Sequence, residues 1–268
     1  MKVYISADIE GVTDVTSWAE TGYGGKGYEQ ACAQMTAEVA AACRGALKAG
    51  AEEVLVKDSH DGGMNIIHKD LPKGVKLVRN WCKSADSMMA CVDVGYDVAF
   101  MVGYHSEGGD EANPLAHTMS HTRIASVHVN GKRMAEMDIN ALICAQYNVP
   151  VGLVTGDKGL CEKAEQDLPG TLTVAVKEGI GSATLNMHPD DATALIEKRA
   201  AEAVKAFKAG KLNVPAPQEK YELIIKFNEH FDAKAATVYP GAYKIDEHTT
   251  GITCKTLTEM LAAFNWMH

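Results

Sequence analysis

The run VYISA at residues 3–7 and the run VLV at residues 54–56 enclose a long helical stretch, and this succession decides the fold. Each run is a short apolar segment of the kind found in buried strands. Between them, apolar side chains recur at helical spacing from Met35 to Leu47, and Gly50 is placed to end the helix. A strand, a helix and a second strand in this order favour a sheet that is covered by helices.

The rest of the chain continues this alternation of strand and helix. Further strands are predicted at residues 75–78, 98–102, 151–155, 172–176 and 223–227, and helices at about residues 138–147, 157–166 and 190–208. One segment departs from the alternation, because residues 124–129 and 132–134 flank Asn130-Gly131, which predicts a hairpin with a type I′ turn. The predicted fold class is therefore α/β, with helices on both faces of a mixed, largely parallel sheet.

Length and composition are those of an ordinary globular enzyme-sized chain. The 268 residues, 46% of them hydrophobic and 23% charged, suit one large α/β domain or a core with a smaller excursion. The single proline-rich joint is NVPAP at residues 213–217. We therefore expect an α/β core at residues 1–212, which carries the metal-binding residues discussed below, and a C-terminal portion at residues 213–268 packed on that core.

Charge and segment patterns exclude several partners. The formal net charge is -9 and no run of Lys or Arg occurs, which argues against nucleic acid. The chain starts directly with a strand, without the apolar region of a secretory signal, and no apolar stretch approaches the ~20 residues that cross a bilayer. We expect a cytoplasmic protein without a membrane partner. The seven cysteines form no C-x-x-C pair, so reduced packing residues are expected.

Two carboxylates follow the first predicted strand. In open α/β sheets, ligands bind beyond the carboxyl ends of strands, and the first strand runs into Asp8 and Glu10. If the extended conformation continues, the period of two places both side chains on one side, and Gly11 lets the backbone turn sharply. Two like charges this close repel each other, and a bound cation would relieve the repulsion.

Histidines follow the next strands in the same manner. His60 lies in the polar loop after residues 54–56, between Asp58 and Asp61, and a carboxylate beside a histidine can orient the ring as a metal ligand. His105 follows residues 98–102. A long glycine-rich loop then leads to His117.

A further carboxylate precedes the helix predicted from Asp138. Glu136 stands at that point, and Asp138 itself is placed to cap the helix. Structural or surface roles are expected for six other histidines: His68, His128, His188, His230, His248 and His268. Mixed carboxylate and imidazole groups without a nearby thiolate suit Zn²⁺, with Mn²⁺ or Co²⁺ as alternatives. Because five ligands exceed the needs of one tetrahedral ion, we expect two ions sharing a carboxylate, an arrangement that activates a bridging water for hydrolysis.

These motifs also carry a family resemblance. The opening SADIEG at residues 6–11 matches the S-x-D-x-E-G pattern of the D-aminopeptidase family (peptidase family M55), typified by the bacterial dipeptide-operon protein DppA. The segments DSH at 58–60, GYH at 103–105, HTM at 117–119 and EMDINA at 136–141 resemble family blocks in the same order, so the likeness covers nearly the whole chain. Asp14 stands where the typical member has glycine.

The resemblance implies roles for individual residues. Five would hold a two-zinc centre, with Asp8 as the bridge and His117 as the catalytic side chain: the metal ligands are Asp8, Glu10, His60, His105 and Glu136. It also implies a three-layer α/β/α fold, release of an N-terminal D-amino acid such as D-Ala from a short peptide, and a homo-oligomeric ring, a decamer in the typical member. His117 would act as base, as oxyanion stabiliser or as nucleophile, alternatives that the sequence leaves open.

Two other readings of the motifs remain at this point. Paired metals also serve hydrolases of other classes, which cleave L-peptides or phosphoesters. A non-enzymatic peptide-binding protein could use a metal for structure alone. The substrate amine could pair with a metal or with a loop acid such as Glu107, Asp110 or Glu111, although solvated positions are expected for these three.

Overall fold

The main sheet of the protein has seven strands, and the computed structural model describes all residues, 1–268. In spatial order the strands are β3 (Lys76–Val78), β2 (Glu53–Asp58), β1 (Lys2–Ala7), β4 (Val98–Tyr104), β7 (Val151–Asp157), β8 (Leu172–Ile180) and β9 (Ala183–Asn186). All neighbouring pairs are parallel except β8 and β9. The predicted α/β class with a mixed, largely parallel sheet is confirmed.

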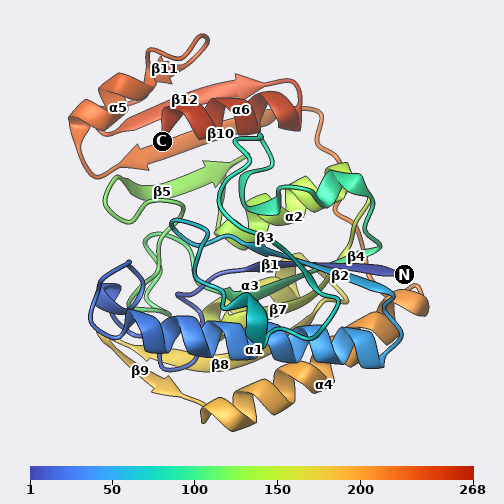
Figure 1. Cartoon of the computed structure of the whole chain (residues 1–268). Coiled ribbons are helices and arrows are strands. Elements are labelled where there is room, and N and C mark those ends of the chain that lie inside the picture. Colours follow the sequence, from blue (N-terminus) through green and yellow to red (C-terminus); the bar gives the residue numbers. More distant parts are fainter.

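Helices cover both faces of this sheet (Figure 1). On one face α1 (Tyr28–Lys48) packs against α4 (Pro189–Lys208), and on the other lie α2 (Glu136–Gln146) and α3 (Lys158–Asp167). The alternation of a strand decides which core each side chain enters: Ile5 of β1 is buried with α1 and α4, whereas Tyr4 faces α2. The three-layer α/β/α arrangement therefore follows from strands that are apolar on both sides.

A second, antiparallel sheet lies beyond α2. Its strands in spatial order are β11 (Tyr243–Lys244), β12 (Thr249–Cys254), β10 (Tyr221–Phe227), β5 (Ile124–Val129) and β6 (Lys132–Arg133), accompanied by α5 (His230–Ala236) and α6 (Leu257–Met267). The predicted hairpin is β5–β6, and Asn130 and Gly131 have the positive φ angles of a type I′ turn, 50° and 79°. It belongs to this second sheet, however, so β9 and not the hairpin gives the main sheet its mixed character. The reason is that β10, from the C-terminal portion, pairs with β5.

The order of the strands places the carboxyl end of β1 between the carboxyl ends of β2 and β4. After β1 the chain proceeds to β2 and β3 on one side, and then returns to β4 on the other side of β1. Ala7 at the end of β1 is in register with Asp58 of β2 and Val102 of β4. Such a reversal opens a crevice beyond the carboxyl ends of the strands, where ligands bind in doubly wound sheets.

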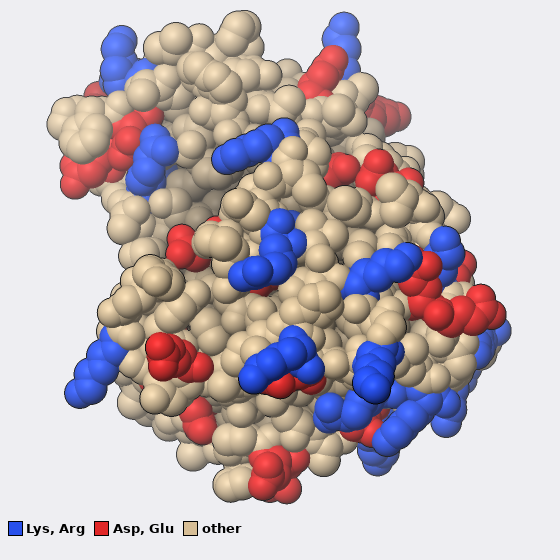
Figure 2. Space-filling model, viewed as in Figure 1, with Lys and Arg blue, Asp and Glu red and all other residues tan.

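The charge on the surface and the apolar character of the helices indicate which kinds of partner to expect. On the face shown in Figure 2, acidic and basic side chains are interspersed. None of the helices combines the length and the apolar character that a membrane crossing requires.

Candidate metal centre

Asp8 and Glu10 lie in the turn that follows β1. The strand ends at Ala7, and a hydrogen bond from the Val12 amide to the Ile9 carbonyl (3.1 Å) closes a turn, so the extended conformation does not continue. Both carboxylates are nevertheless buried, and each has an oxygen close to the same nitrogen of His60: 3.2 Å for Asp8 and 3.1 Å for Glu10. The two acids therefore converge as predicted, although a turn and not a strand brings them together.

Gly11 allows this turn to touch the neighbouring strand. Its amide donates to the Gly103 carbonyl at 2.8 Å, and a Cβ at position 11 would lie 1.6 Å from the carbonyl oxygen of Tyr104. Gly11 is not among the residues with a positive φ angle. Close approach of two backbones, and not a left-handed turn, is what requires glycine here.

His60 is oriented by a backbone carbonyl. Its Nε2 is 2.7 Å from the carbonyl oxygen of Thr21, so Nε2–H donates there and Nδ1 turns a lone pair toward Asp8 and Glu10. The expectation that a flanking carboxylate orients this ring is wrong, because Asp58 is used by the loop itself: it accepts from the amides of Asn65 and neighbouring Ile66 at 2.6 and 2.8 Å.

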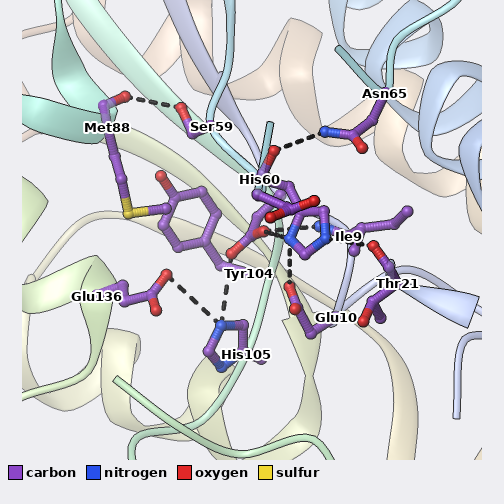
Figure 3. Close-up of polar contacts among 12 residues, drawn as sticks. Ile9, Glu10, Thr21, Ser59, His60, Asn65, Met88, Tyr104, His105 and Glu136 are labelled. Carbon is purple, nitrogen blue, oxygen red and sulfur yellow. Dashed lines mark hydrogen bonds and ion pairs between the residues drawn. The ribbon is translucent and has the colours of Figure 1, made fainter. Parts of the chain in front are cut away.

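His105 and Glu136 form the other side of the centre (Figure 3). The Nδ1–H of His105 donates to the Ser106 carbonyl at 3.0 Å, which leaves Nε2 3.4 Å from Asp8 Oδ2 and 3.5 Å from Glu136 Oε2. Glu136 is the first residue of α2, so its carboxylate lies at the positive end of the helix dipole. Asp138 does not cap this helix as predicted; Ala135 is the N-cap, and Asp138 accepts from the Ala135 amide at 2.8 Å.

His117 lies against this second group. Its Nε2 is 3.6 Å from Glu136 Oε1, and its ring stacks on His105 with centroids 4.3 Å apart and an angle of 6° between the planes. The Nδ1–H donates to the Leu115 carbonyl at 3.0 Å, and the rings of Trp18 and His117 form a T-shaped pair with centroids 5.3 Å apart. His117 therefore also presents a free nitrogen lone pair toward a carboxylate.

The side chains divide into two groups, and within each group the potential ligand atoms all lie within 4.8 Å of one another. One group is Asp8, Glu10 and His60, and the other is His105, His117 and Glu136. Asp8 joins them, because its Oδ1 faces His60 and its Oδ2 faces His105. All predicted site residues thus meet at one place.

The arrangement fits a bound cation. In each of the three imidazoles one nitrogen donates to a backbone carbonyl, so the other nitrogen meets carboxylate oxygens with lone pair facing lone pair. His105 Nε2 and Glu10 Oε2 are buried without a hydrogen-bond partner. Buried polar atoms are rarely left without a partner, and carboxylate and imidazole donors are those that Zn²⁺ prefers.

The electrostatics of the metal-free site point the same way. Burial disfavours the charged imidazolium, but Glu10 and Asp8 outweigh it and raise the pKa of His60 well above its usual value. For His105, burial again lowers the pKa, but Glu136 and Asp8 outweigh burial and raise the pKa well above its usual value. Burial opposes ionisation of Asp8 as well, yet the adjacent imidazoles of His105 and His60 hold the pKa of its carboxyl well below its usual range. Without a metal, the site attracts protons in its place.

A cavity of about 800 Å³ opens onto the centre. Its wall includes all three tryptophans of the chain, Trp18, Trp81 and Trp266. Lys83 is the single Lys or Arg on the wall, and neither Glu107 nor the two loop acids that follow it line the cavity. The volume suits a short peptide.

Sequence reasoning missed two contributors to the site. Thr21, which orients His60, and Trp18, which packs beside His117, both lie at the 3₁₀ helix Trp18–Glu20, far along the chain from the histidines that they contact. A backbone carbonyl carries no residue-specific signal, so the Thr21 contact could not be anticipated. The Trp18 contact had a weak signal, since an aromatic residue in a polar loop is unusual.

The fold and the site together define an α/β protein with a buried carboxylate–imidazole centre of the metallohydrolase type. The chain belongs to the family Peptidase_M55, described as D-aminopeptidase, whose model matches residues 1–266. A D-aminopeptidase of Bacillus subtilis (strain 168) is 30% identical over 271 residues, a match that covers 100% of this chain and 95% of the relative. The solved structure of the zinc-dependent D-aminopeptidase DppA from Bacillus subtilis, described as a self-compartmentalizing protease, is similar with a TM-score of 0.93 and 28% identity, covering 100% of this chain and 96% of that one. The family resemblance and the fold class are thereby confirmed.

Proposed function

We propose that this protein is a zinc-dependent aminopeptidase that releases N-terminal D-amino acids such as D-Ala from short peptides. One observation carries the proposal: Asp8 turns Oδ1 to His60 and Oδ2 to His105, and so joins the two groups of potential ligand atoms. The zinc dependence of the similar Bacillus subtilis enzyme supports the choice of metal. A cavity large enough for a short peptide reaches the same atoms.

The proposed ligands of two Zn²⁺ ions are Asp8, Glu10, His60, His105 and Glu136, with Asp8 as the bridge. Bound zinc would polarise the scissile carbonyl and lower the pKa of a bound water. The chain contributes the placement of these ligands: the contacts of His60 to Thr21 and of His105 to Ser106 fix the ring tautomers that leave one nitrogen free for a metal.

His117 is the proposed catalytic side chain. Because its Nδ1–H is held by the Leu115 carbonyl, its Nε2 is the atom free to act at the cavity, which His117 lines. In this state Nε2 can accept a proton or attack the carbonyl carbon, and after protonation it can stabilise the oxyanion or return the proton to the leaving amine. Its distance from Glu136 also permits a role as a further metal ligand, so the variant described next separates the two roles.

The test compares the wild type with one variant, His117→Ala. Purified wild-type protein is expected to contain two transition-metal ions per chain and to release D-Ala from D-Ala-D-Ala, and chelation should abolish the release. His117→Ala is expected to keep both metals and to lower turnover by about 10²–10⁴-fold, the scale of general acid–base catalysis. Loss of a metal from this variant would instead make His117 a ligand. Turnover that survives complete chelation would contradict the mechanism.

The alternatives are outcomes of one substrate comparison. Matched D- and L-peptides and a phosphoester are offered to the metal-loaded protein, and preference for the D-peptide is expected. Preference for the L-peptide or the phosphoester would assign a different dinuclear hydrolase, and no turnover of any substrate would favour a metal-containing peptide-binding protein.

We also propose a homo-oligomeric ring, a decamer, acting in the cytoplasm. The self-compartmentalizing relative supports an assembly of this kind, and the fold is similar along the full chain. Light scattering on the protein as it elutes from a size-exclusion column should give the mass of ten chains, and a monomeric mass would contradict the ring. Cell fractionation tests the compartment.

A further inference from the structure

A buried hydrogen-bond network lies directly beneath the metal centre, and we propose that it sets the spacing of the metal ligands. Its members are Ser6, Ser59, Tyr104 and Asn140, and they are positioning residues that do not themselves touch the metals. The proposal rests on the proposed function, because it concerns how this chain holds the ligands of that centre. All four residues are buried.

The contacts of the network are short and continuous. The Tyr104 hydroxyl accepts from Asn140 Nδ2 at 2.9 Å and is 2.5 Å from the Ser6 hydroxyl. Ser6 is in turn 2.8 Å from the Ser59 hydroxyl, and both serines lie within 3.0 Å of the carbonyl oxygen of Met88. Figure 3 draws the contact between Ser59 and Met88, with the Tyr104 ring alongside.

Each member lies close along the chain to a different proposed ligand. Ser6 is on β1 and Asp8 just after it, Ser59 and His60 both follow β2, Tyr104 ends β4 and His105 follows it, and Asn140 lies one turn after Glu136 on α2. The network therefore joins the four elements at a level just below the one at which the ligands meet. A shift of any element relative to the others would break one of its hydrogen bonds.

One direction of donation satisfies every hydroxyl. Asn140 donates to Tyr104, Tyr104 donates to Ser6, and Ser6 and Ser59 donate onward so that the chain ends on the Met88 carbonyl. No proton is used twice and no hydroxyl is left without a partner. A fully satisfied buried network of this kind is rigid, whereas a partly satisfied one is costly.

The ligands need such a support because they repel one another. Three carboxylates meet in a buried space, and the elements that carry them must keep them there against their mutual repulsion. A metal site works when its ligands are held within about 0.5 Å of the productive geometry by groups behind them. Loss of such supporting groups costs about 10–100-fold in metal affinity.

Two tyrosines give a matched test. Tyr104→Phe removes the central hydroxyl of the network, and Tyr4→Phe removes a hydroxyl that is equally buried but donates only to the Ala90 carbonyl, at 2.9 Å. Zn²⁺ affinity is measured for both variants by competition with a chromophoric chelator, and the Co²⁺-loaded proteins are compared by their absorption spectra. We expect Tyr104→Phe to weaken binding about 10–100-fold and to change the Co²⁺ spectrum, and Tyr4→Phe to leave both as in the wild type.

The outcomes separate this proposal from the proposed function. Equal affinities for the two variants, whether unchanged or equally weakened, would overturn the positioning role. A wild-type protein that fails to bind two ions would instead overturn the proposed metal centre. Should Tyr104→Phe fail to fold, Ser6→Ala carries the same test, because it breaks the same chain while removing a single small hydroxyl; wild-type affinity in that variant would also overturn the positioning role.

Discussion

Gly11→Ala is expected to disable the metal centre through the backbone alone. The added Cβ would lie 1.6 Å from the Tyr104 carbonyl oxygen and 2.8 Å from the Gly103 carbonyl carbon. Since Cβ contacts below 3.0 Å are essentially never seen, the two segments must separate by at least 1.4 Å, the difference between 3.0 and 1.6. Both partners are backbone atoms, so no side-chain rotation can relieve the contact.

This separation falls between two segments that carry ligands. Glu10 immediately precedes Gly11, and His105 immediately follows Tyr104. A displacement of 1.4 Å exceeds the tolerance of about 0.5 Å for a working metal site, and a misplacement of about 1 Å can cost 10²-fold in rate. We therefore expect weaker zinc binding and a fall of at least about 100-fold in kcat/KM, with a loss of about 1–3 kcal/mol in the free energy of unfolding.

Gly62→Ala is the matched control. Both glycines lie close after a proposed ligand, Gly62 two residues after His60 and Gly11 one residue after Glu10. A Cβ added at Gly62, however, would meet only the flexible end of Met64, at 3.6 Å. Both substitutions reduce the freedom of the unfolded chain alike. Zinc affinity by chelator competition and D-Ala release are measured for both. Wild-type zinc affinity in Gly11→Ala, or an equal loss in both variants, would refute the reasoning.

Three further predictions concern charge. Asp8→Asn should remove both metals, measured as metal content per chain, whereas retention of one tightly bound ion would show that Asp8 serves a single group. In metal-free protein, the raised pKa values of His60 and His105 contribute stability that is present below about pH 6.5 and is lost as the pH rises through the folded-state pKa values. Unfolding by denaturant should therefore be easier at about pH 9 than at about pH 6. Added zinc should reverse this trend, because its ligands must be deprotonated. Lys83→Ala should raise KM for D-Ala-D-Ala by up to about five-fold, the scale of an exposed ion pair, and leave KM for the C-terminal amide unchanged, since Lys83 is the single Lys or Arg on the cavity wall.

The main sheet could be predicted because its signals are local. Strands such as β1 and β4 are apolar runs buried on both faces, and the long helices between them have their own periodicity. The second sheet could not, because β5 and β10 are about a hundred residues apart and the hairpin pattern at β5 fits either sheet equally well. Hydrophobic pattern states that a face is buried, but not which other segment buries it.

The proposed ligands were also accessible to sequence reasoning, but the residues that contact and support them were not. Asp8, His60 and His105 each follow a strand, and the ends of parallel strands meet at one edge of a sheet. The supporting residues carry ordinary identities: Thr21 contacts His60 through its backbone carbonyl, and Tyr104, a member of the proposed positioning network, looks like any aromatic core residue. Their roles depend on distances that only the folded chain defines.

The central place of Asp8 follows from the topology of the sheet. Because the chain places β2 and β4 on opposite sides of β1, the turn after β1 lies between His60 and His105. A residue in this turn that binds a cation on each side needs two acceptor atoms of about equal strength. A carboxylate has two such atoms, whereas an amide has one. Aspartate is short enough to keep both oxygens close to the strand end, and its Oδ1 and Oδ2 indeed face the two histidines at 3.2 and 3.4 Å. The strand order thus creates a position that suits a ligand shared by both sides, which supports the bridging role proposed for Asp8.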